Sequence, residues 1–421
     1  MKKSLSSVLI LLLVALLCAC GASKNMAAED ADINLEMQSY SLERSSGAEE
    51  SMTEDDFGEA ATNNYDVSDA RTVPAEQLEQ LVYVTFLLHS DYTLDNNSGK
   101  VFTYQCYEPT ILTEDDAVND WIASVVDNAS QATAKEIGRV EQQALYDLEN
   151  REDVDASFYT YSYYSNVTTE RMDNHVLSAL QVNSIYSGGA HPNYAQIAYN
   201  LDLSNQTVLS LSDVILPNTE DELKQRVLDE LSGRFGGLEN SGLYPDYAEI
   251  VSSSFEPSKL TSNWYFTENS LVIYFNCYDI APYAAGIIKI SLPYETLGEI
   301  LDPAFLPDRS IAGEGSVAHI TSLDGRQVLD AGADGDRFYI GTDKMLNDVK
   351  LYRITGWITE DVPIMGQMMF AANRLSSKDA LTLQNYGGFD YLLTCRNREG
   401  QLLKVAVSAT ELKEIVAEVA E

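Results

Sequence analysis

Basic residues are scarce in this sequence. Its 421 residues include 27 lysines and arginines against 65 aspartates and glutamates, which gives a formal net charge of −38. A surface of this kind repels nucleic acid and anionic lipid head groups, whereas it attracts cations and basic proteins by long-range steering. The charge therefore excludes nucleic acid as a partner and favours a cationic protein. The same charge also serves solubility outside a cell, and composition alone does not separate these two interpretations.

Cysteine is scarce as well, with five in the chain. Two lie close to the start, and the other three, Cys106, Cys277 and Cys395, are widely spaced. This spacing resembles neither a disulfide framework nor a zinc site. We expect the three later cysteines to be buried and reduced, although one disulfide with one remaining thiol stays open.

The sequence also lacks the common catalytic motifs. No two of its four histidines are spaced as a His-x-x-x-His metal pair, and neither His-Glu-x-x-His nor Gly-x-Ser-x-Gly occurs. Cys277 and His191 could form a nucleophile pair, but Cys277 follows a strand pattern and is expected in the core. Paired carboxylates for glycoside hydrolysis stay open among the many acids. We predict no catalytic residue, no metal and no cofactor.

No stretch after the N-terminal apolar run is long and apolar enough to cross a membrane, because a membrane-spanning helix needs about 20 apolar residues. The most apolar run, Leu5–Leu17, follows Lys2 and Lys3 and is shorter, as in a secretory signal peptide. It ends in Leu-Cys-Ala-Cys, which looks like a lipobox. We predict that residues 1–19 are a lipoprotein signal peptide and that a lipid on Cys20 holds the protein at the outer face of a bacterial membrane. An ordinary signal peptide with incidental cysteines is the alternative.

The composition divides the mature chain into a tether and three folded units. Residues 20–73 are rich in acids and poor in apolar side chains, so we expect a disordered acidic tether. The patterns that follow predict an α+β fold of mixed sheets with a few packed helices. We place an N-terminal α+β domain at 74–186, a second α+β domain at 187–302, and a β-rich C-terminal domain of unknown role at 303–421.

Local patterns predict particular elements within these units. Residues 80–88 and 101–107 have the β-branched and aromatic composition of strands, and Pro109 indicates a turn. The capping-box pattern Thr113-Glu-Asp-Asp predicts the start of a helix. A second capping box, Ser408-Ala-Thr-Glu, predicts a C-terminal helix carrying Leu412 and Ile415.

The segment Ile185-Tyr-Ser-Gly-Gly-Ala-His-Pro-Asn-Tyr194 is the most informative motif. Its two glycines permit positive φ and close backbone approach, and Pro192 disfavours helix at His191. The pattern therefore indicates a tight loop between two strands that presents a histidine and tyrosines. The alternative is a structural turn whose polar side chains bond to nearby backbone.

Four separate motifs in this region together resemble one extracytoplasmic family. They are the loop just described, the segment 200–213, the segment Tyr278-Asp-Ile-Ala-Pro-Tyr-Ala-Ala-Gly, and Ile290-Ser-Leu-Pro-Tyr. The family is that of the outer domain of the anti-sigma factor RsiV, which also occurs beside the deacetylase domain of the wall enzyme PdaC. The preceding unit, with its Tyr107-Glu-Pro strand, is similar to the companion N-terminal domain. The resemblance covers residues 75–302 and excludes 303–421.

The resemblance implies an α+β fold outside the cell and, as for RsiV, the binding of lysozyme. The chain has no motif of a metal-dependent deacetylase, so we favour a binding lipoprotein over an enzyme. An accessory or enzyme of peptidoglycan modification stays open, as does a purely structural envelope role. The candidate ligand-binding residues are Tyr186, Gly188, Gly189, His191, Asn193, Tyr194, Tyr278 and Tyr283, although tyrosines are also ordinary strand formers.

Overall fold

The computed structural model describes residues 80–97, 99–151, 158–235, 242–255, 263–307, 316–332, 335–359, 361–396 and 402–416. The predicted signal peptide, Cys20 and the predicted tether lie outside these ranges, so those three assignments stay predictions. Among the described residues, no helix is both long and apolar enough to cross a membrane.

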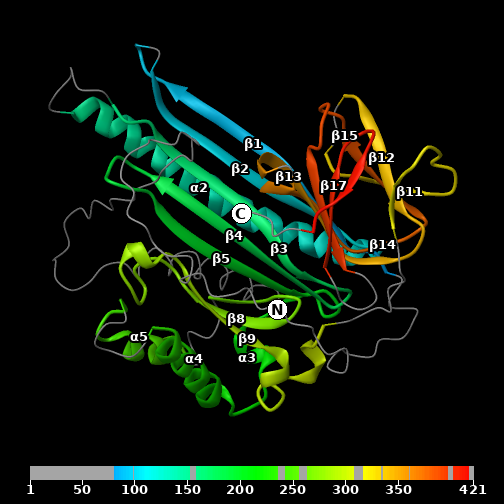
Figure 1. The fold of residues 1–421 in the computed structure, drawn as a ribbon. Coiled ribbons are helices and arrows are strands. Elements are labelled where there is room, and N and C mark those ends of the chain that lie inside the picture. The colour runs from blue at the N-terminus through cyan, green and yellow to red at the C-terminus, as the bar shows by residue number, and fades with distance from the viewer. Residues whose placement is uncertain are drawn as a thin grey trace.

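A large sheet forms the centre of the molecule (Figure 1). Its order is β18-β17-β16-β13-β14-β1-β2-β3-β4-β5-β6, and strands from all three predicted units take part. The fold is therefore α+β, as predicted, but its main sheet continues across the boundaries proposed from the sequence. The strands are β1 (Tyr83–Leu94), β2 (Lys100–Leu112), β3 (Tyr161–Met172), β4 (Val176–Tyr186), β5 (Asn193–Asp202), β6 (Thr207–Val208), β13 (Leu346–Thr359), β14 (Val362–Leu375), β16 (Tyr391–Arg396), β17 (Leu402–Val407) and β18 (Leu412–Glu414).

Helix α2 (Asp116–Asn150) packs along one face of this sheet (Figure 1). Ile122, Val140 and Ala144 are buried against the strands. The helix was predicted, but its cap was assigned to the wrong residue. The Asp115 carboxylate accepts the backbone N–H groups of Ala117 at 2.8 Å and Val118 at 3.3 Å. The side chain of Thr113 instead accepts the N–H of Asp115 at 3.1 Å, so it lies before the helix and not at its cap.

The predicted turn at Pro109 is also wrong, because Pro109 lies within β2 opposite Phe86 of β1. Proline cannot donate to a sheet ladder and is tolerated where one side of a strand is unpaired. That condition holds here, because β3 pairs only with Phe102–Cys106 of β2. The part of β2 that contains Pro109 therefore needs no N–H on its second side.

A second layer lies below the β4–β5 edge of the large sheet (Figure 1). Its sheet contains β7 (Trp264–Phe266), β8 (Ser270–Phe275) and β9 (Ile288–Pro293). Helices α3 (Leu211–Val214), α4 (Glu220–Phe235) and α5 (Tyr247–Ser254) complete the layer. Leu223, Val227 and Leu231 recur at helical spacing on α4 and are fully buried in its core. The side chain of Asn200 on β5 donates to the Trp264 carbonyl at 2.9 Å, which joins the two layers.

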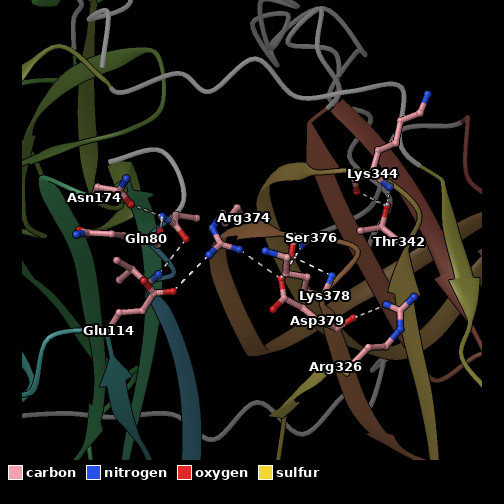
Figure 2. A network of polar contacts seen from close by, with 12 residues as sticks. Gln80, Glu114, Asn174, Arg326, Thr342, Lys344, Arg374, Ser376, Lys378 and Asp379 are labelled. Atoms are coloured by element: carbon pink, nitrogen blue, oxygen red, sulfur yellow. Dashed lines mark hydrogen bonds and ion pairs between the residues drawn. The ribbon is translucent and has the colours of Figure 1, made fainter. Parts of the chain in front are cut away.

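A four-stranded sheet completes the C-terminal part, in the order β10 (Val317–His319), β12 (Arg337–Thr342), β15 (Asp379–Gln384), β11 (Gln327–Asp330). It shares one core with β13, β14 and β16. Figure 2 shows a polar network at its border with the rest of the molecule. The Arg374 guanidinium lies 3.4 Å from a carboxylate oxygen of Asp379 and 3.4 Å from one of Glu114. Arg374 thus connects this sheet to the start of α2.

The predicted C-terminal helix is wrong over the described residues, because Leu412–Glu414 form strand β18. The Ser408 hydroxyl accepts the N–H of Glu411 at 2.8 Å, and the N–H of Ser408 donates to the Glu411 carbonyl at 3.0 Å. These bonds close a tight turn between β17 and β18. The same serine side chain that would cap a helix therefore stabilises a hairpin here.

Candidate aromatic binding site

The predicted loop connects β4 to β5, with Ile185 opposite Asn193 at its base. Gly188 has a φ of +99°, and a Cβ atom at this position would lie 2.7 Å from the Tyr161 hydroxyl oxygen. Both the backbone conformation and the close approach of Tyr161 require glycine. The glycine predicted to shape this loop is thus essential to its geometry.

A second loop, between β8 and β9, lies beside the first. The N–H of Gln196 on β5 donates to the Asn276 side-chain oxygen at 2.7 Å, and the Asn276 amide donates back to the Gln196 carbonyl at 3.3 Å. These two bonds hold the β8–β9 loop against β5. Tyr278 in this loop has a φ of +70°, which is rare for a residue other than glycine. Strained backbone of this kind persists only where the surrounding structure holds it in place.

Four aromatic side chains from the two loops and the start of β5 meet in one cluster, which we call the aromatic cluster: His191, Tyr194, Tyr278 and Tyr283. The His191 and Tyr283 rings stack with centroids 3.8 Å apart and planes 17° apart. The Tyr194 ring lies 6.3 Å from that of Tyr283, and the Tyr278 ring lies 5.7 Å from it. Tyr283 is therefore the central ring, while Tyr278 is 50 % exposed and forms the outer surface.

Hydrogen bonding sets the orientation of the His191 ring. Its Nδ1 atom lies 3.0 Å from the Pro192 carbonyl oxygen. A carbonyl oxygen only accepts, so Nδ1 carries a proton. In the neutral imidazole the other nitrogen, Nε2, is then an acceptor, and the Tyr278 hydroxyl lies 3.5 Å from it. Stacking on Tyr283 and contacts at both ring nitrogens thereby orient His191 between the two loops.

The remaining predicted residues form no recorded ring contact with the aromatic cluster. The Tyr186 hydroxyl donates to the Gly189 carbonyl at 3.3 Å, and the Tyr186 ring meets that of Tyr161 edge to face. Asn193 is the first residue of β5. Tyr186 therefore braces the base of the loop.

Two polar residues of the site were not found from the sequence. Asn276 ties the two loops together, and Asp279 accepts the Asn276 N–H at 2.7 Å. Burial raises the pKa of the Asp279 carboxyl to about 6. The place of Asp279, directly after Tyr278, was the only available signal, because its burial depends on contacts between distant segments.

The arrangement suits binding better than catalysis. Tyrosine faces bind apolar and cationic groups by stacking and cation–π attraction. Burial raises the pKa of the Cys277 thiol, which disfavours the thiolate that a nucleophile requires. Across the described ranges, His, Cys, Asp and Glu side chains form no group of three or more that could hold a metal.

Two known family models match separate regions of the chain. Residues 95–194 match the model described as "Deacetylase PdaC", and residues 212–295 match the model described as "Protein of unknown function (DUF3298)". The chain carries an extracytoplasmic domain of the PdaC/RsiV type. His191 and Tyr194 lie within the PdaC match, whereas Tyr278 and Tyr283 lie within the DUF3298 match. The aromatic cluster is therefore one of the contacts between the PdaC-type and DUF3298-type regions.

Two solved structures of the DUF3298 family are similar to this chain. One, from Bacteroides fragilis NCTC 9343, is 16% identical with a TM-score of 0.41, and the match covers 52% of this chain and 93% of that one. The other, from Pseudomonas aeruginosa PAO1, is 17% identical with a TM-score of 0.36, covering 54% and 97% respectively. No curated protein matches the chain in sequence.

Proposed function

We propose that this protein is a lipid-anchored binding protein of the bacterial cell envelope, which recognises a cationic protein such as lysozyme through the aromatic cluster. The observation that carries the proposal is the stacking of Tyr283 on His191 and Tyr194, with Tyr278 beside Tyr283, between the two matched regions. Domains of the PdaC and DUF3298 types belong to extracytoplasmic, cell-wall-related proteins. The lipobox ending at Cys20 supports the anchor.

The charge of the chain supports a cationic partner. Loss of residues 1–19 would remove Lys2 and Lys3, leaving 27 − 2 = 25 basic against 65 acidic residues. A net charge near 25 − 65 = −40 would speed association with a basic protein. At the contact itself, the exposed ring of Tyr278 offers a face for a lysine or arginine side chain. Long-range electrostatic attraction speeds the encounter with a basic protein, and contacts with the aromatic cluster select among basic proteins.

Lysozyme binding by Tyr283 variants tests this proposal. Tyr283→Ala removes the central ring, so we expect affinity for lysozyme to fall roughly tenfold or more, as at an interface hot spot. Tyr283→Phe keeps the ring and should retain most of the affinity. The matched control is Tyr146→Ala on α2, which removes a tyrosine that is 60 % exposed but lies outside the aromatic cluster.

Selectivity decides whether charge alone explains any binding. Cytochrome c is similarly basic and unrelated to lysozyme, so it should bind more weakly to the wild-type protein. Raised salt should slow association, because the Debye length falls from about 10 Å at 0.1 M to about 3 Å at 1 M. Equal affinity for both basic proteins, or no binding of lysozyme at low salt, would contradict the proposal.

A role in peptidoglycan modification is the second candidate. The match of residues 95–194 to a model described as a deacetylase favours it. Release of sugar or acetate from purified peptidoglycan by the isolated protein would support this role. Absence of release together with selective lysozyme binding would leave the binding protein as the function.

A further inference from the structure

Strand β1 has an open edge along most of its length. All of β1 pairs with β2 on one side, but on the other side β14 pairs only with Tyr83–Thr85. Among the described residues, no strand pairs with Phe86–Leu94 on this second side. Figure 1 shows the β1–β2 hairpin extending away from the body, with β1 as its outer strand. An open edge of this length is a template for pairing with another strand.

The backbone groups on this edge can be assigned from one hydrogen bond. The Val82 carbonyl accepts the N–H of Asn373 in β14 at 3.0 Å, so the backbone groups of Val82 point to the β14 side. This is the side that is open from Phe86 onward. Alternate residues of a strand direct their N–H and C=O groups to the same side. Leu88, Ser90 and Tyr92 therefore present their backbone groups outward. The N–H of Tyr92 is covered by the Asp91 carboxylate at 2.7 Å.

The side chains of the same segment are unusually apolar for a surface. Leu87 is 60 % exposed, Leu88 46 %, Tyr92 51 % and Leu94 49 %. Natural edge strands are commonly protected by lysine, proline or a bulge. Between Phe86 and Tyr92, β1 has none of these features. Its ionisable side chains are Asp91 and His89, and the His89 Nε2 atom lies 3.4 Å from a carboxylate oxygen of Glu108 on β2. An exposed apolar edge in an otherwise strongly acidic protein indicates an interaction surface.

We propose that this edge binds the same edge of a second copy of the chain, antiparallel and with the two-fold axis at Ser90. The segment is self-complementary about that residue. Pairing at Ser90 places His89 opposite the partner's Asp91, and Leu88 opposite the partner's Tyr92. An acid thus meets an imidazole, and an aliphatic side chain meets an aromatic one, as in favourable cross-strand pairs. A two-fold interface requires this match of a surface with itself.

Pairing would use the backbone groups just assigned. The Ser90 N–H would donate to the carbonyl of the partner's Ser90, and the Tyr92 N–H to the carbonyl of the partner's Leu88. The Asp91 carboxylate, which covers the Tyr92 N–H in the single chain, would then turn to the partner's His89. A parallel arrangement in register would instead place each Asp91 beside another. The charges therefore favour the antiparallel pair.

Substitution at Ser90 tests the dimer. The full chain carrying Cys20→Ser, which prevents acylation, is measured by sedimentation equilibrium over the widest soluble concentration range. Ser90→Pro removes only an outward N–H and is compatible with an edge strand. We expect it to raise the dimer dissociation constant roughly tenfold or more, because two intersubunit hydrogen bonds are lost. Ser90→Ala keeps the N–H and should leave the dimer intact, and circular dichroism checks that each variant is folded.

An engineered disulfide at Ser90 tests the register of the proposed intersubunit strand pair. Ser90→Cys places two thiols at the axis, where strand spacing permits a disulfide, so oxidation should give a covalent dimer. Ser252→Cys on α5 is the control and should give none above the background. A chain that is monomeric at all concentrations would overturn the proposal, and so would a dimer that Ser90→Pro leaves unchanged.

Salt separates this inference from the proposed function, on which it does not rest. Two copies of a chain with a charge of −38 repel each other, so added salt should strengthen the dimer. The same salt should slow lysozyme association. Failure of one property therefore leaves the other testable in the same protein.

Discussion

At the scale of single residues, Gly188 determines the geometry of the β4–β5 loop. Its φ of +99° and the 2.7 Å approach of a Cβ to the Tyr161 hydroxyl oxygen leave no room for a side chain. Gly188→Ala should lower the free energy of unfolding by about 1–3 kcal/mol, through backbone strain and displacement of Tyr161. Urea denaturation measures the change. Affinity for lysozyme should fall as well, since His191 and Tyr194 are carried by or next to this loop.

The control for this substitution is a glycine without such constraints. Gly138 lies inside α2, and a Cβ there would have no atom within 4 Å. Gly138→Ala should stabilise the protein by about 0.5–1 kcal/mol, because alanine loses less conformational entropy than glycine in a helix. Two Gly→Ala changes of opposite sign would identify the strain at Gly188, whereas two equal changes would contradict it.

Asp279 should make stability depend on pH. Burial raises the pKa of its carboxyl from 3.8 to about 6 in the folded protein. The folded state therefore holds the proton more strongly than the unfolded state, and this group lowers stability as the pH rises from about 4 to about 6. Asp279→Asn keeps an acceptor for the Asn276 N–H but cannot ionise. We expect the variant to be more stable than wild type by about 1–3 kcal/mol at pH 7.

The comparison between pH values isolates the effect of ionisation. Near pH 4 the wild-type carboxyl is protonated in the folded state, so the difference between the two proteins should shrink towards zero. Urea midpoints of both proteins at pH 4 and pH 7 provide the measurement. A variant that is equally destabilised at both pH values would show that Asp279 acts only through its hydrogen bond.

The residues of the aromatic cluster could be found from the sequence, but their arrangement could not. His191 and Tyr194 belong to the motif at the β4–β5 loop, and Tyr283 belongs to the motif in the β8–β9 loop. These two loops are far apart in the sequence. The motifs mark rigid loops, because glycine and proline restrict the local backbone. Nothing local indicates that Asn276 ties the loops together or that Asp279 is half-buried, since both facts depend on packing between strands.

At the scale of elements, substitution of Asp115 tests its assignment as the N-cap of α2. The Asp115 carboxylate satisfies two backbone N–H groups that have no partner within the helix. Asp115→Ala should destabilise the protein by about 1 kcal/mol, and Asp115→Asn, which keeps an acceptor, by much less. Thermal or urea unfolding measures both. Equal losses for the two variants would point to charge, and not to capping, as the source of the effect.

The two predicted capping boxes show that this local pattern does not by itself predict a helix. Thr113-x-x-Asp116 lies at the start of a real helix, although Asp115 is the cap. Ser408-x-x-Glu411 forms similar local bonds but closes a turn into β18. Serine and threonine side chains bond to nearby N–H groups in either setting. The pattern becomes a helix or a turn depending on whether the following residues pair with a strand, and here Leu412 pairs with Val407.

At the scale of the whole molecule, the sequence does not reveal how the C-terminal part joins the rest. Tyr83 pairs with Ala372, and this contact brings β13, β14, β16, β17 and β18 into one sheet with β1–β6. Each strand is recognisable from its composition, but pairing between such distant segments leaves no local pattern. Residues 303–421 were therefore predicted as β-rich, yet their role in extending the main sheet and in the Arg374 network could not be foreseen (Figure 2).

In the proposed function, the position of the whole molecule in the cell depends on a lipid on Cys20. A lipoprotein signal peptide predicts that this cysteine becomes the acylated N-terminus, so Cys20→Ser should release the protein from the membrane fraction. Cys18 lies two positions earlier in the same motif and would be removed with the signal peptide. Cys18→Ser is thus a matched control that should leave the protein in the membrane fraction. Washed membranes are compared with the soluble fraction by immunoblotting. If the Cys20 variant stays with washed membranes, the anchor lies elsewhere; if both variants are released, the release does not identify Cys20 as the acylated residue.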